Sequence, residues 1–181
     1  MLIIFEGLDK SGKSMLAKIV QKSLHAVMIR KTYNTNLYPI DYSKASEYDW
    51  QAILDRVVLA NPDIDFVADR SFFTQTAYQV CLGTGEHAIT DAQSSMYNNY
   101  CKVVKSIPHL IVYCESAKYE LDSMVTNVRT KNAIDAMYKK MLAKSELTTL
   151  ILDVDDNTLY TSVRQILDTI VALNKEVYAV K

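Results

Sequence analysis

Short apolar runs recur along the chain, separated by longer stretches in which apolar and polar residues are mixed. The first run, Leu2-Ile3-Ile4-Phe5, is continuous, which is typical of a strand buried on both faces of a parallel sheet. Four later runs are similarly short and apolar. The predicted strands cover residues 2–5, 26–30, 65–68, 110–113 and 150–152.

Between these strands, apolar residues recur at intervals of three and four, the spacing of a helix with one buried face. In the first such stretch they are Met15, Leu16, Ile19, Val20 and Leu24. Similar patterns predict helices over residues 14–25, 50–60, 73–82, 91–106, 133–144 and 159–173. Alternating strands and helices favour an α/β fold, with a five-stranded, mostly parallel sheet flanked by helices and formed by residues 1–181 as one domain.

The composition is that of an ordinary globular protein. Hydrophobic residues make up 49% and charged residues 23% of the 181 positions, which excludes a disordered or fibrous chain. The formal net charge of -1 gives no global positive field for nucleic acid, so an anionic ligand must be bound locally. No apolar run approaches the roughly 20 residues that span a bilayer. No signal sequence precedes the first strand, and we expect a cytoplasmic protein without a membrane partner.

The cysteines and histidines form no recognisable disulfide or metal pattern. Cys81, Cys101 and Cys114 are odd in number and widely spaced, so we predict buried thiols in a reducing compartment. The histidines at positions 25, 87 and 109 have no partners at ligand spacing. The acidic run over residues 153–156 is interpreted as a solvated loop.

A glycine-rich segment follows the first strand and precedes the first helix. Residues 7–14 read GLDKSGKS, which matches the phosphate-binding pattern G-x-x-x-x-G-K-[ST], and they hold two of the four glycines of the chain. In this motif, backbone N–H groups surround the phosphates, the lysine reaches the β- and γ-phosphates, and the hydroxyl ligates Mg²⁺. The predicted nucleotide-binding residues are Gly7, Lys10, Ser11, Gly12, Lys13 and Ser14.

A carboxylate and a guanidinium follow the third predicted strand. Asp69 and Arg70 would lie at the carboxyl edge of the sheet, beside the glycine-rich loop. Asp69 can hold Mg²⁺ or its water ligands, and Arg70 can bind the phosphate of an acceptor with its planar fork. This pair favours a small-molecule kinase among the proteins that carry such a loop.

Two segments resemble the thymidylate kinase family. Residues 4–14, IFEGLDKSGKS, are similar to the family's FEGxDxxGKS/T loop, and residues 69–79, DRSFFTQTAYQ, are similar to its DRY-type segment. The resemblance implies a P-loop NTPase three-layer sandwich with a short lid near residues 123–131. It also implies ATP and Mg²⁺ as cofactors and a deoxynucleoside monophosphate, first of all dTMP, as the substrate.

The resemblance also assigns residues to the acceptor. Asp9 would contact the sugar 3′-hydroxyl, and Arg70 would bind the 5′-phosphate. Thr74 and Gln75 would face the base, and Tyr78 would lie near C2′ and favour deoxyribose. A glutamine suits thymine because its amide can donate to O4 and accept from N3.

On the donor side, the resemblance adds two cations. Lys10 stands where the family often has an arginine that acts on the transferring phosphate; a lysine keeps the charge and loses the bidentate fork. Arg129 is the candidate in the lid that would close over ATP, and the alternative is an ordinary solvated arginine at a helix end. The predicted catalytic residues are Lys10, Lys13, Asp69, Arg70 and Arg129.

The chain departs from the family after the second strand. Residues 30–36 read RKTYNTN in place of an REPGGT-like sequence, and residues 31–48 form either a substrate-covering loop or a solvent-facing connection. Trp50 and Arg56 could replace the aromatic and basic residues that the family carries before the DRY-type segment, although we interpret Trp50 as a core residue. The short length would fit a phage or viral member acting in the host cytoplasm.

Three activities stay open at this point. The first is transfer of the ATP γ-phosphoryl group to dTMP, giving dTDP and ADP. A deoxynucleoside kinase would instead phosphorylate a 5′-hydroxyl and would need a carboxylate base, either Glu6 or Asp69. A non-catalytic module would bind nucleotide without turnover. The expected partners are small deoxynucleotides and, by the resemblance, a second copy of the chain in a homodimer, with helix 91–106 as a candidate contributor.

Overall fold

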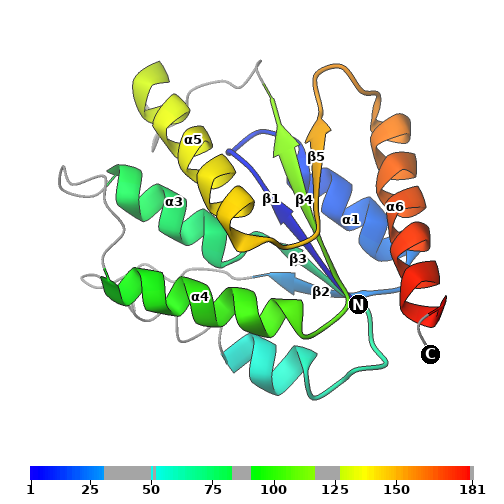
Figure 1. Ribbon diagram of the computed structural model, residues 1–181. Coiled ribbons are helices and arrows are strands. Elements are labelled where there is room, and N and C mark those ends of the chain that lie inside the picture. Colours follow the sequence, from blue (N-terminus) through cyan, green and yellow to red (C-terminus); the bar gives the residue numbers. More distant parts are fainter. Residues whose placement is uncertain (31–49, 51, 83–90, 117–126, 180–181) are drawn as a thin grey trace.

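The computed structural model describes residues 1–30, 50, 52–82, 91–116 and 127–179. Its centre is a sheet of five parallel strands in the order β2-β3-β1-β4-β5 (Figure 1). The strands are β1 (Leu2–Glu6), β2 (Val27–Arg30), β3 (Phe66–Asp69), β4 (His109–Glu115) and β5 (Thr149–Asp153). The predicted strands are therefore confirmed, with ends that differ by one or two residues.

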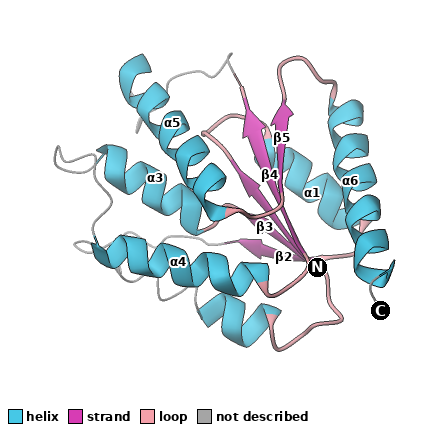
Figure 2. Ribbon diagram, viewed as in Figure 1, coloured by secondary structure: helices cyan, strands magenta, loops and turns pink. Residues whose placement is uncertain are grey.

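Helices cover both faces of this sheet (Figure 2). They are α1 (Lys13–Ser23), α3 (Phe72–Leu82), α4 (Asp91–Lys105), α5 (Val128–Ser145) and α6 (Leu159–Ala179), together with a π-helical turn, η1 (Leu54–Val58). The α/β three-layer sandwich predicted from the sequence is confirmed.

The two faces of β1 divide the core. Leu2 and Ile4 pack in a cluster with side chains of α3, α4 and α5, whereas Ile3 and Phe5 pack with α1 and α6. This alternation follows from the strand period of two, and all four side chains are fully buried. β1 is the middle strand, so the loop that follows it emerges between the two helical layers.

Three helix predictions need correction, and one of them is the helix predicted over residues 159–173, which extends to Ala179. The helix predicted over residues 50–60 contains η1 in place of a regular α-helix. The helix predicted over residues 133–144 begins at Val128, because the side chain of Asn127 caps it by accepting a hydrogen bond from the Thr130 backbone N–H at 2.8 Å. The first buried residue of that helix is Ile134, so the apolar spacing alone pointed to a later start.

Several core predictions can be checked directly. Trp50 is 2% exposed and packs in the core, as predicted, while Arg56 is exposed on η1. Cys101 and Cys114 are buried as predicted, but Cys81 is only half-buried. Tyr97 and Tyr100 of α4 are also buried within the chain. These two tyrosines of α4 therefore pack in the core of this chain.

Residues 31–48 and 123–126, which are the predicted covering loop and the first four residues of the predicted lid, lie outside the described residues; the rest of the predicted lid, residues 127–131, forms the N-cap and first turn of α5. Among the helices that the structure describes, none has the length and apolar content of a membrane-spanning segment.

Candidate active site

The glycine-rich loop lies where the sequence predicted it, between the end of β1 and the start of α1. Gly7 has φ 135°, and a Cβ added there would lie 2.5 Å from the backbone carbonyl oxygen of Cys114. Gly12, the N-cap of α1, has φ 75°. Both glycines therefore occupy backbone conformations that favour glycine, and they turn the loop around the helix N-terminus.

Lys13 points back into this loop. Its side chain is 4% exposed, and Nζ donates a hydrogen bond to the Leu8 carbonyl oxygen at 2.9 Å. Nζ also lies 3.8 Å from Oδ1 of Asp9. The ammonium group is thus held at the glycine-rich loop, between the Leu8 carbonyl oxygen and the Asp9 carboxylate.

Three residues predicted to bind the acceptor come together beside the loop. Arg70 forms an ion pair with Oδ1 of Asp9, and its guanidinium carbon lies 5.6 Å from the centre of the Tyr78 ring. The Tyr78 hydroxyl donates to Oδ2 of Asp9 at 3.0 Å. The structure therefore brings the P-loop carboxylate, the guanidinium after β3 and a phenol of α3 into one cluster, which we call the acceptor cluster.

The sheet explains how Arg70 reaches Asp9. β3 pairs with β1 in parallel register, with Phe5 opposite Asp69. The backbone N–H of Arg70 extends this pairing by donating to the Phe5 carbonyl oxygen at 2.9 Å. Arg70 itself has φ 78°, a left-handed conformation that a non-glycine residue adopts only at a cost.

A buried hydrogen-bond chain lies behind the acceptor cluster. Glu6, the last residue of β1, is fully buried and accepts hydrogen bonds from the hydroxyls of Ser71 and Thr74. Thr74 in turn accepts from the Tyr138 hydroxyl of α5 at 2.7 Å. The resemblance implies that Thr74 faces the base, whereas in the structure its hydroxyl lies between Glu6 and Tyr138. The sequence signal that could have pointed to this chain is a glutamate at the end of a fully apolar strand, because a buried carboxyl group needs hydrogen-bonding partners.

Burial of Glu6 leads to a pH-dependent stability. Loss of solvation raises the pKa of its carboxyl above the ordinary value of 4.5, although hydrogen bonds and nearby positive charges oppose the rise. The folded protein therefore keeps this proton at pH values where the unfolded chain has released it, and the stability contribution is lost as pH rises through the folded-state pKa.

Glu6→Gln removes this titration. We expect the Tm of the variant, relative to that of the unsubstituted protein, to rise with pH above the ordinary carboxyl pKa of 4.5, measured by thermal denaturation in matched buffers. A Tm difference that is the same at every pH would contradict this expectation.

The other predicted site residues occupy the rim. Ser14 is exposed in the first turn of α1, and Asp69 is half-buried at the end of β3. Their hydroxyl and carboxylate oxygens are hard donors of the kind that Mg²⁺ takes together with nucleotide phosphates. Lys10 and Arg129 are exposed, Arg129 in the first turn of α5. Gln75 is half-buried in α3.

A cavity of about 280 Å³ adjoins the glycine-rich loop. Ser116 after β4 and Asp155 in the turn between β5 and α6 line it, and their side chains are hydrogen-bonded at 2.8 Å. The rest of the lining is Lys10, Ser11, Gly12, Met15, Leu16, Val154, Asn157, Leu159 and Ser162. Asp153 and Asp156 are exposed, as expected of a solvated loop, and Asp155 is half-buried.

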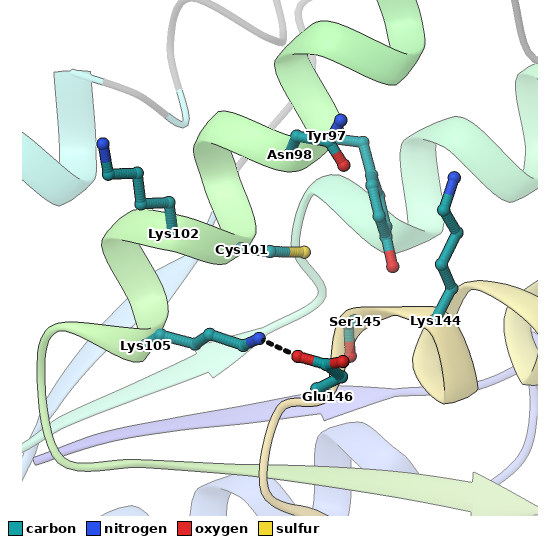
Figure 3. Close-up of a pocket in the computed structure, with 8 residues that line it drawn as sticks. All are labelled: Tyr97, Asn98, Cys101, Lys102, Lys105, Lys144, Ser145 and Glu146. Carbon is teal, nitrogen blue, oxygen red and sulfur yellow. Dashed lines mark hydrogen bonds and ion pairs between the residues drawn. The ribbon is translucent and has the colours of Figure 1, made fainter.

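A second hollow, of about 370 Å³, lies between the last turns of α4 and α5 (Figure 3). Lys105 donates to Glu146 across it at 2.6 Å, and the Lys144 ammonium lies 6.0 Å from the centre of the Tyr97 ring. This hollow lies near the amino ends of β4 and β5, whereas the glycine-rich loop follows the carboxyl end of β1. It is therefore separate from the candidate site, and both of these lysines are already engaged.

No protein-family model and no curated protein matches the sequence. Solved structures match the fold over nearly the whole chain. YorR from Bacillus subtilis, in complex with phosphorylated GDP, has a TM-score of 0.70 and 16% identity, with 97% of this chain and 98% of that chain covered. Thymidylate kinase from Candida albicans has a TM-score of 0.63 and 18% identity, with 96% and 92% covered.

Deoxyadenosine kinase from M. mycoides, with the products dCMP and dCDP bound, has a TM-score of 0.60 and 13% identity, with 95% of this chain and 100% of that chain covered. Identities this low define a shared fold and leave the substrate open. The phosphate loop, the parallel sheet and these likenesses agree: the chain has the P-loop NTPase α/β fold that these thymidylate and deoxyadenosine kinases share.

Proposed function

We propose that this chain transfers the γ-phosphoryl group of ATP to a deoxynucleoside monophosphate, with dTMP as the first candidate, giving dTDP and ADP. The observation that carries the proposal is the acceptor cluster of Asp9, Arg70 and Tyr78 beside Lys13. A guanidinium, a carboxylate and a phenol can together bind a phosphate and a sugar, next to a loop suited to a triphosphate. The likeness in fold to a thymidylate kinase supports the same assignment.

On the acceptor side, Arg70 would bind the 5′-phosphate and Asp9 the 3′-hydroxyl. An incoming phosphate would compete with Asp9 for the guanidinium, and the Tyr78 hydroxyl would remain as a partner for the carboxylate. Tyr78 would also limit the space at C2′. Because the Thr74 hydroxyl is bonded to Glu6, we assign the polar part of base recognition to Gln75.

In the transfer step, an oxygen of the acceptor phosphate forms a bond to the γ-phosphorus while the bond from that phosphorus to the β–γ bridging oxygen breaks, and ADP leaves. The attacking oxygen is already ionised at neutral pH, so no general base is required. Lys13, Lys10 and Arg129 would stabilise the charge of the transferring group. Ser14 and Asp69 would hold Mg²⁺, which neutralises phosphate charge when bound.

The donor base would enter the 280 Å³ cavity. Lys10, Ser11 and Gly12 belong both to its lining and to the glycine-rich loop, so a nucleotide whose phosphates fill the loop would reach this cavity with its base. The apolar side chains of Met15 and Leu159 would contact the ring.

We further propose a homodimer in the cytoplasm, with the oligomeric state to be measured by sedimentation.

A deoxynucleoside kinase is the competing assignment, because a deoxyadenosine kinase has the same fold. Such an enzyme activates a neutral 5′-hydroxyl and needs a carboxylate base. Both oxygens of Glu6 already accept hydrogen bonds, so Asp69 is the remaining candidate of the two.

Acceptor-dependent release of ADP tests the proposal. With ATP and Mg²⁺, we expect turnover with dTMP that exceeds turnover with dUMP, dCMP, dAMP, dGMP and the corresponding nucleosides. Turnover with nucleosides alone would assign a deoxynucleoside kinase. Binding of ATP without any acceptor-dependent turnover would assign a non-catalytic module.

A further inference from the structure

A buried carboxyl group, that of Glu6, lies behind the acceptor cluster, and the proposed transfer to a monophosphate does not use it. Glu6 ends the central strand β1, and its two oxygens are used separately. Oε1 accepts from the Ser71 hydroxyl, and Oε2 accepts from Thr74 at 2.5 Å. A fully buried carboxyl group is costly unless hydrogen-bond partners satisfy it, so the arrangement fixes both hydroxyls.

The first of these bonds holds the residue next to Arg70. Arg70 has φ 78°, a conformation that relaxes unless both of its neighbours are held. Its own N–H is bonded to the Phe5 carbonyl oxygen, and Ser71 is bonded to Glu6. Both anchors lie on β1, so the backbone on each side of the strained residue is tied to the same strand. Relaxation of this turn would redirect the guanidinium away from Asp9.

The second bond holds the start of α3. Thr74 lies in the first turn of this helix, and Tyr78 follows one turn later. The Tyr138 hydroxyl of α5 donates to the same Thr74 oxygen, which adds a third element to the connection. Glu6 thereby fixes two of the side chains at the Asp9 carboxylate, Arg70 through the turn and Tyr78 through the helix.

We propose that Glu6 is a positioning residue for the acceptor: by accepting hydrogen bonds from Ser71 and Thr74, it holds the turn between β3 and α3 so that Arg70 and Tyr78 face Asp9. The kinetic consequence rests on the proposed function, whereas the geometric consequence does not.

Ser71→Ala tests the proposal, and Ser145→Ala is its matched control. Both hydroxyls are buried, at 1% and 2% exposure, and each accepts a hydrogen bond from the backbone N–H two residues later, at 3.3 Å and 3.1 Å. Ser71 bonds to Glu6, while Ser145 donates to the Leu142 carbonyl oxygen near the end of α5. The two substitutions therefore remove similar groups, and only the first reaches Glu6.

We expect Ser71→Ala and Glu6→Gln to raise the KM for the acceptor by about tenfold, while the KM for ATP stays within about twofold. Ser145→Ala should change neither constant. If the substitutions only lowered the stability of the fold, the KM for the acceptor and the KM for ATP would change together or not at all. Should Glu6→Gln fail to fold, Ser71→Ala carries the test alone.

A second readout does not depend on turnover. The Nε–Hε signal of Arg70 in a ¹H–¹⁵N spectrum, identified through Arg70→Lys, reports on the ion pair with Asp9. We expect it to shift in Ser71→Ala and to stay in place in Ser145→Ala. An unchanged Arg70 signal in Ser71→Ala would overturn the positioning role. If the original protein phosphorylates no acceptor, the proposed function fails, and this signal still decides the inference about Glu6.

Discussion

Lys13→Ala should lower acceptor-dependent turnover by about 10²- to 10³-fold, because it removes the cation that, in the proposed reaction, would neutralise charge on the transferring phosphoryl group. The ammonium is held at the loop by the Leu8 carbonyl oxygen and lies near Asp9, so solvent or another lysine cannot readily take its place. The measurement is kcat from the ADP-release assay at saturating acceptor. Circular dichroism would show that the variant is folded.

Lys18→Ala provides the control for this prediction. Lys18 is an exposed lysine on the same helix, α1, and its removal should change turnover by less than about twofold. Unchanged turnover in a folded Lys13→Ala variant would defeat both the phosphate-binding role and the proposed kinase activity.

Gly7→Ala should destabilise the fold by about 3 kcal/mol, since the added methyl group meets a backbone atom and the backbone conformation is unfavourable for alanine. The new Cβ would lie 2.5 Å from the Cys114 carbonyl oxygen, and φ at this position is 135°. The carbonyl belongs to β4, which pairs with β1, so it cannot move without disturbing the sheet. Urea denaturation would measure the loss.

Gly12→Ala separates the two causes. Gly12 also has a positive φ, 75°, but no atom lies within 4 Å of its added Cβ. We expect a loss of about 1 kcal/mol from the conformational strain alone. A loss in Gly7→Ala no greater than that in Gly12→Ala would contradict this expectation.

The sheet and the phosphate loop could be predicted from the sequence because their signals are local. The run from Leu2 to Phe5, the pattern over residues 7–14 and the pair Asp69-Arg70 each fall within a few positions. Parallel pairing of strands then brings their carboxyl ends to one edge, which places Asp9 and Arg70 together. The sequence did not predict the order of the strands in the sheet. Any order with β1 beside β3 would bring Asp9 and Arg70 together.

Contacts that join distant segments could not be predicted in the same way. Glu6 meets Ser71, 65 positions later, and Thr74 meets Tyr138, 64 positions later. Such bonds depend on how α3 and α5 pack, which the spacing of apolar residues along the chain does not specify. The left-handed conformation of Arg70 likewise comes from its anchors on β1, because arginine has no intrinsic preference for it.

The acceptor cluster joins Asp9 and Tyr78, which are 69 positions apart, across the central pairing of β1 with β3. A molecule in which these strands separate has no acceptor site, so a substrate that binds the cluster favours the closed sheet over every opened form. At a hundred times the dissociation constant, that linkage amounts to about 2.7 kcal/mol. A higher substrate concentration in a cell would thus raise the resistance of this chain to proteolysis as well as its rate of reaction.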